Sequence, residues 1–137
     1  MVIAMRVKRI LVVGGDECLV AMIQNILRNE GCESDATASG EVALEKAMNV
    51  DYQMVIIDMR LPGIPGVEVA QRIRKLGDKT NLIVLADDST FNDCIDLLDY
   101  GVEDILIKPV ESNELTRVIG EALRSHDEVA DNYENRC

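Results

Sequence analysis

The segment MVIID, residues 54–58, is an apolar run of strand length that ends in a carboxylate. Three further runs share this apolar character: RILVV (9–13), LIVLA (82–86) and DILIK (104–108). Short, continuous runs rich in Val and Ile are typical of strands that are covered on both faces of a sheet. A more polar stretch, CESDAT (32–37), fits a fifth strand at a sheet edge. We therefore predict a sheet whose central strands are fully buried.

The segments between these runs carry apolar residues at helical spacing, which predicts helices with one buried face. The glycines Gly31, Gly77 and Gly101 follow three of these segments and are typical helix terminators. Alternation of strands and helices predicts an α/β fold, a doubly wound five-stranded parallel sheet with helices on both faces. The apolar stripes fall within residues 19–27, 44–48, 69–76, 91–98 and 115–123.

The extent of the regular pattern predicts the limits of the domain. One domain is expected over residues 6–125, and the polar tail 126–137 is expected to be frayed or to begin a linker. Phe91, the single phenylalanine, opens the fourth predicted helix. We expect it to pack in the core or in a groove.

Composition argues against several classes of function. The chain has 137 residues, of which 47% are apolar, enough for the core of one domain. A net charge of -11 argues against nucleic-acid binding by this domain, which would require a basic surface. The chain has neither an apolar stretch of membrane-spanning length nor a recognisable signal peptide. We therefore expect a cytoplasmic protein without membrane association.

The cysteines do not predict a metal site. Cys18, Cys32, Cys94 and Cys137 show no CxxC spacing, and the single histidine, His126, lies in the polar tail. Without a secretion signal these thiols are expected to be reduced. The first three cysteines are expected to pack as small apolar residues.

Ligands of parallel α/β sheets bind at the carboxyl ends of the strands, so the residues there are the candidates for chemistry. They comprise Gly14 to Glu17 after the first predicted strand, Asp58 after the third, Ala86 after the fourth and Lys108 after the fifth. A buried Asp58 would require a partner, because burial of an unpaired charge is unfavourable. The sequence therefore predicts an ion pair between Asp58 and Lys108.

Two longer segments resemble the receiver domain of two-component response regulators. They are VIIDMRLPGIPGVEVAQRIR (55–74) and GVEDILIKPVESNEL (101–115), and the resemblance extends over nearly the whole chain. It implies a flavodoxin-like (βα)5 fold with strand order 2-1-3-4-5. It also implies that Asp58 stands at the phospho-accepting position, and that Lys108 is the family's lysine, which precedes a proline with a cis peptide bond.

The resemblance also implies supporting residues that this chain lacks. A receiver holds magnesium partly through an acidic pair after its first strand, and Gly14 and Gly15 stand at those positions. Ala86 replaces the hydroxyl that senses the phosphoryl group, and Ile105 replaces the aromatic residue of the switch. Asp16 substitutes for the acidic pair only if one glycine is an insertion. We therefore expect no metal and no cofactor. Magnesium would bind only if Asp16 substitutes for the acidic pair.

Three functions remain open. The leading hypothesis is an atypical receiver, not an enzyme, that acts as a protein-interaction module independently of phosphorylation. Its partner would be a protein such as a histidine kinase or a phosphotransfer protein, or a second copy bound through the fourth helix, fifth strand and fifth helix. The alternatives are an active receiver phosphorylated on Asp58 with reduced magnesium dependence, and a small-ligand sensor using the glycine-lined pocket near Asp58.

Overall fold

The computed structural model describes residues 7–134, with side chains described as far as Ser125. Strands and helices alternate along the chain, and the parallel strands form one sheet in the order β2-β1-β3-β4-β5. This confirms the predicted fold. The strands are β1 (Arg9–Val13), β2 (Glu33–Thr37), β3 (Met54–Asp58), β4 (Asn81–Ala86) and β5 (Asp104–Ile107). The helices are α1 (Glu17–Asn29), α2 (Gly40–Asn49), α3 (Gly66–Leu76), α4 (Phe91–Ile95), the 3₁₀ helix η1 (Asp96–Tyr100) and α5 (Ser112–Glu134).

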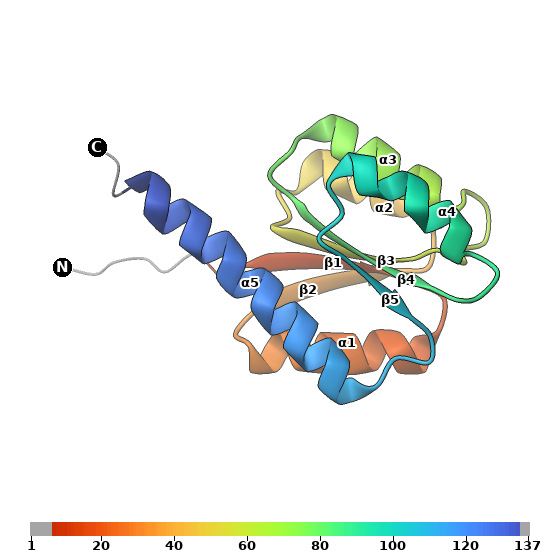
Figure 1. The fold of residues 1–137 in the computed structure, drawn as a ribbon, viewed down its shortest axis with the longest axis horizontal. Coiled ribbons are helices and arrows are strands. Elements are labelled where there is room, and N and C mark those ends of the chain that lie inside the picture. Colours follow the sequence, from red (N-terminus) through yellow and green to blue (C-terminus); the bar gives the residue numbers. More distant parts are fainter. Residues whose placement is uncertain (1–6, 135–137) are drawn as a thin grey trace.

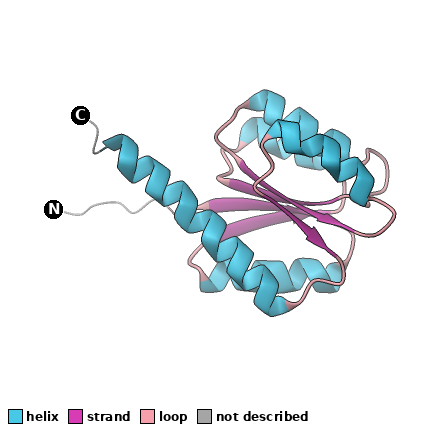
Figure 2. Ribbon diagram, viewed as in Figure 1, coloured by secondary structure: helices cyan, strands magenta, loops and turns pink. Residues whose placement is uncertain are grey.

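Helices cover both faces of the sheet, as Figures 1 and 2 show, with α1 and α5 on one face and α2, α3 and α4 on the other. Alternate residues of each central strand therefore enter two different cores. In β3, Met54 and Ile56 pack with the first group of helices, whereas Val55 and Ile57 pack with the second. All four side chains are fully buried. This two-sided burial explains the uninterrupted apolar runs in the sequence.

The fourth helix differs from its predicted form. Only one turn of α-helix forms before the backbone tightens into η1, which has about three residues per turn. Cys94 and Leu97, three residues apart, consequently face the core, while Phe91, Ile95 and Leu98 are 42%, 49% and 60% exposed. Phe91 therefore does not pack in the core, which was one of the two positions expected for it.

Two other local features depart from expectation. Helix α5 continues to Glu134, so loss of the apolar period near residue 126 does not end it; Figure 1 shows this helix extending past the sheet. Cys32 and Cys94 are buried as expected, but Cys18 is exposed on α1. Cys137 and the side chain of His126 lie outside the described residues. The domain limits stay a prediction.

A hydrogen-bonded cluster joins the edge strand β2 to the centre of the sheet. The Tyr52 hydroxyl donates to Asp35 at 2.6 Å, and Arg9 donates to the same carboxylate oxygen at 3.2 Å. Burial, followed by the hydrogen bond to Asp35, raises the pKa of Tyr52 to about 12. The Arg9 and Tyr52 hydrogen bonds lower the pKa of Asp35. These hydrogen bonds give the polar strand β2 side-chain partners that its few apolar residues do not provide.

Tyr52→Phe should lower the free energy of unfolding by about 1–3 kcal/mol, because it removes a hydrogen bond to a charged group. The folded chain holds the Tyr52 proton more tightly than the unfolded chain, in which the pKa is about 10. Its contribution is therefore present below about pH 10 and lost as the pH rises towards 12. Urea unfolding measured across this pH range should show that the free energy of unfolding falls less steeply with rising pH in the variant than in the wild type. Tyr100→Phe is the control, and parallel loss in wild type and Tyr52→Phe would contradict the assignment.

Candidate functional site at the carboxyl edge of the sheet

Asp58 and Lys108 lie on either side of strand β4. The amide of Met59 donates to the carbonyl of Leu85, and the amide of Lys108 donates to that of Ala86. These bonds fix the ends of β3 and β5 against β4. The Lys108 ammonium then donates to Asp58 Oδ2 at 2.5 Å, so the predicted ion pair is present.

The carboxylate of Asp58 is buried and held at both oxygens. Asp58 is 4% exposed, and its second oxygen, Oδ1, accepts a hydrogen bond from the Arg60 amide at 2.9 Å. A Cβ at Gly66 would lie 2.4 Å from the Asp58 carbonyl oxygen, so only glycine lets α3 begin this close to the strand end. The peptide between Lys108 and Pro109 is cis, as the resemblance implied.

The glycines that follow β1 are not required by the backbone. Neither Gly14 nor Gly15 has a positive φ. A Cβ at Gly14 would make ordinary contacts, 3.5 Å from Val20 and 3.6 Å from Asp58, and a Cβ at Gly15 would meet nothing within 4 Å. The Gly14 amide already donates to the Thr37 carbonyl, so it does not face an anion. The turn therefore has room for a Cβ at both positions.

Asp16, the residue that would substitute for the acidic pair, has a structural role. It is the N-cap of α1, and its Oδ1 accepts a hydrogen bond from the Leu19 amide at 3.1 Å. Asp16, Gly14 and Asp58 border a cavity of only about 10 Å³. Within the described chain, no three Asp, Glu, His or Cys side chains converge as ligands of a metal ion. The side chains present here do not fit the magnesium site that the family resemblance implies.

The two switch positions lack the groups that the resemblance implies. Ala86 is buried at the end of β4 and carries no hydroxyl, and Ile105 packs against the core on the α2–α3 side of the sheet. Neither side chain can donate a hydrogen bond towards Asp58. The chemistry that remains at the site is one carboxylate neutralised by one ammonium.

A bridge between two loops spans this edge of the sheet, and sequence reasoning did not identify it. Arg60 Nε donates to Asp87 at 2.6 Å, and the same guanidinium donates to the Ser89 hydroxyl at 2.5 Å. The Arg60 hydrogen bond is the main reason why the pKa of Asp87 lies well below its usual range. The Asp87 carboxylate also accepts from the amides of Ser89 and Thr90. The bridge ties the loop after β3 to the loop after β4.

The sheet order, together with an aspartate–lysine pair at its carboxyl edge, defines a receiver domain. Residues 10–120 match the family model of the response regulator receiver domain. The chain belongs to this family and is a receiver domain of two-component signalling. Among the residues that the structure describes, no helix combines the length and apolar character needed to span a bilayer.

Named relatives and solved structures agree with this family. The chain is 32% identical over 115 residues to the response regulator ArlR of Staphylococcus haemolyticus, covering 84% of this chain and 52% of that protein. It is 34% identical over 117 residues to the uncharacterized transcriptional regulatory protein YkoG of Bacillus subtilis, covering 85% and 51%. The chain thus spans about half the length of these relatives. A CheY-like receiver from Methanospirillum hungatei JF-1 superposes with a TM-score of 0.82 at 26% identity, covering 90% and 98%.

Lys108→Met should destabilise the fold by about 3–5 kcal/mol, because it leaves the buried Asp58 carboxylate without its counter-ion. The double variant Asp58→Asn, Lys108→Met should recover a large part of this loss. Urea unfolding of both variants and of each single change measures the coupling. Lys75→Met, which removes an exposed lysine, is the matched control. Equal destabilisation by Lys108→Met and by the double variant would mean that the pair has no energetic role.

Proposed function

We propose that this chain is an atypical receiver that works as a protein-interaction module without ordinary magnesium-dependent phosphorylation. The observation that supports this proposal is that an aspartate–lysine pair and two glycines lie together at the carboxyl edge of the sheet. Asp58 and Lys108 are in place, whereas Gly14 and Gly15 provide no side chain for a metal. Loss of supporting groups alone weakens metal affinity about 10–100-fold, so loss of direct ligands should weaken it at least as much. We further propose that the chain acts in the cytoplasm and catalyses no turnover of a separate substrate.

An active receiver is the second candidate, because Asp58 retains the position and the lysine that phosphorylation would use. This function would depend on Asp16 for the metal. Such a role would compete with the bond from Asp16 to the Leu19 amide, which caps α1. Carboxylates at a helix N-terminus are already favourable, so Asp16 has a sufficient structural explanation.

A sensor for a small ligand at Asp58 has less support. The cavity bordered by Gly14 and Asp58 is about 10 Å³. Small-molecule sites usually have volumes of about 300–1,000 Å³. A nucleotide would therefore require the surrounding loops to move apart.

The interaction surface that we propose is the α4 face, defined as Phe91, Ile95 and Leu98. These side chains follow one another at spacings of four and three residues and are all exposed. Asp93 and Asp96 lie between them in the sequence, and Asp99 directly follows Leu98. The surface therefore suits a partner with an apolar centre and basic surroundings. Such a partner would be a histidine kinase, a phosphotransfer protein or an output protein.

Binding of a second copy through the same face is less favourable on electrostatic grounds. A symmetric dimer brings the same patch of both subunits together. The acidic residues of the two faces would then repel each other. We therefore propose a different protein as the partner.

Incubation of the wild-type chain with acetyl phosphate and magnesium should leave its mass unchanged by intact mass spectrometry. The variant Gly14→Asp, Gly15→Asp should gain one phosphoryl group if the remaining geometry is competent, because two carboxylates are then available to magnesium. Its magnesium affinity should exceed that of wild type by at least about tenfold, measured by calorimetry.

The control for this experiment is Asp58→Ala, alone and in the two-aspartate background. Labelling of the wild type that disappears in Asp58→Ala would establish the active receiver and overturn the proposal. Equal magnesium affinity of the wild type and the two-aspartate variant would mean that Asp16 supplies the ligand.

The triple variant Asp93→Asn, Asp96→Asn, Asp99→Asn should self-associate at least about tenfold more strongly than wild type, because it keeps the apolar α4 face and loses the repelling charges. Sedimentation equilibrium at low and high salt measures this. A control with the same change in charge is Glu17→Gln, Glu30→Gln, Glu41→Gln. A wild-type dimer that Leu98→Lys dissociates would contradict the proposal of a different partner.

A further inference from the structure

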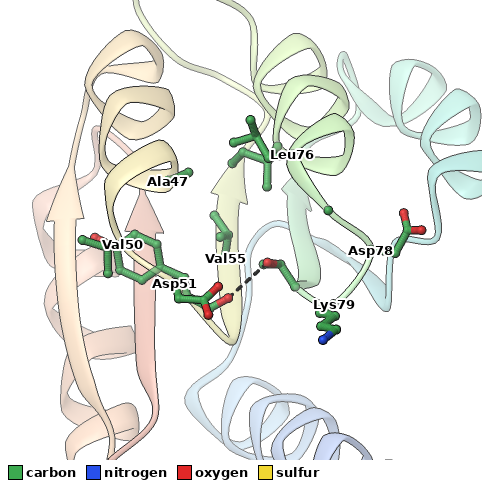
Figure 3. Close-up of a pocket in the computed structure, with 11 residues that line it drawn as sticks. Ala47, Val50, Asp51, Val55, Leu76, Asp78 and Lys79 are labelled. Atoms are coloured by element: carbon green, nitrogen blue, oxygen red, sulfur yellow. Dashed lines mark hydrogen bonds between the residues drawn. The ribbon is translucent and has the colours of Figure 1, made fainter.

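We propose that a groove between the C-terminal ends of α2 and α3 is a docking site for a protein segment that carries a basic side chain beside aliphatic ones. Figure 3 shows this groove, with α2 on one side, α3 on the other and β3 between them. It lies at the amino-terminal ends of the strands, whereas Asp58 ends β3 at the opposite edge of the sheet. The groove is therefore separate from the Asp58 site and the α4 face, and the proposal does not depend on the function proposed above.

The groove has the size and lining of a binding site. Its deeper part measures about 350 Å³, within the usual range for ligand sites. A second hollow of about 520 Å³ shares Ala47, Val50, Asp51 and Leu76 with it and continues over Met48. Because the two hollows share these four residues, a chain segment laid across both would contact α2 and α3 together. The apolar lining of the deeper part comes from Ala47, Val50, Tyr52, Val55, Ile73 and Leu76.

Apolar side chains lie unprotected along this groove. Met48 is 70% exposed and Leu76 is 54% exposed, although both belong to helices that bury their other faces. Val55 and Ile73 form a buried floor beneath them. Methionine adapts its shape to different partners because its side chain is unbranched and flexible. The aliphatic part of a docked segment would cover this surface.

The charge around the groove selects a cationic group. Helices α2 and α3 end here at Asn49 and Leu76, and a helix C-terminus carries about half a negative charge. Arg74 donates to the Thr80 carbonyl and offsets this charge at α3, so the helix contribution comes mainly from α2, beside Asp51. Asp51 lines both hollows, and Asp78 lies at the end of the deeper one. Among the described residues, neither carboxylate has a salt-bridge partner, and Lys79 is the one cationic residue that lines the groove.

A lysine or arginine of a partner matches both properties of the groove. Its aliphatic stem packs on apolar surface while its charged end stays near water and carboxylates. Asp51 offers a carboxylate for the charged end next to apolar surface for the stem, because it borders the two hollows beside Ala47 and Val50. We therefore assign Asp51 as the residue that selects the basic side chain.

The test uses two short peptides that differ in one charge. The full chain, labelled with ¹⁵N, is titrated with acetyl-Leu-Arg-Leu-amide and with acetyl-Leu-citrulline-Leu-amide, in which citrulline is a nearly isosteric neutral replacement for arginine. The arginine peptide should cause saturable shifts in the amide signals of residues 47–52 and 73–80. The citrulline peptide should bind at least about threefold more weakly, given the helix termini and one surface ion pair.

Variants of the groove sharpen this comparison. Asp51→Asn should weaken the arginine peptide by about two- to fivefold and leave the citrulline peptide unchanged. Leu76→Asn should weaken both peptides. Asp88→Asn, which removes an exposed carboxylate near the opposite edge of the sheet, should change neither.

Several results would overturn the proposal. These are equal affinity for the two peptides, shifts that map elsewhere, or no saturable shift up to the solubility limit. Groove shifts that appear when the chain alone is concentrated would also overturn it, because the occupant would then be a second copy.

Discussion

Asp58 is the one charged side chain that is buried among the described residues, and its position depends on neutralisation by Lys108. Asp58 ends β3 and Lys108 directly follows β5, so the ion pair is possible only when β3, β4 and β5 lie side by side in register. The pair therefore links the chemistry of the site to the packing of the sheet. Loss of Lys108 would leave this carboxylate buried without its counter-ion, which would destabilise the fold. Stability alone is a sufficient reason to keep the pair.

Much of the fold was predictable from local patterns. The runs at 9–13, 54–58, 82–86 and 104–108 match strands within about one residue. Burial on both faces explains the uninterrupted apolar signal of the first three. The fourth, β5, is a partly exposed edge strand, so the expected burial on both faces was wrong there. The apolar pattern predicted the structure less well where the backbone changes from α-helix to 3₁₀ helix. Residues 91–98 suggested one regular helix, but the tightening into η1 exposes three of the four residues in its apolar stripe. The continuation of α5 was missed because the apolar period on which the prediction rested ends near residue 126.

The candidate site was predictable only in part. The Asp58–Lys108 pair follows from two opposite charges at the carboxyl ends of β3 and β5, the two strands that flank β4. The Arg60–Asp87 bridge does not, because both residues lie in loops whose approach depends on tertiary structure. Its only signal in the sequence was an arginine placed two residues after the aspartate. The groove between α2 and α3 is similar, since residues far apart in the chain enclose it. The sequence therefore predicts which groups are present more readily than it predicts the surfaces that they form.

The turn after β1 has a consequence for how this domain changes over evolutionary time. Neither Gly14 nor Gly15 is needed for a positive φ, and a Cβ at either position would meet nothing closer than 3.5 Å. Folding therefore places little constraint on these two positions, so selection for stability does not preserve the glycines. The side chains at this turn can then change without refolding the domain. The chemistry of this edge of the sheet is therefore free to vary while the rest of the fold stays as it is.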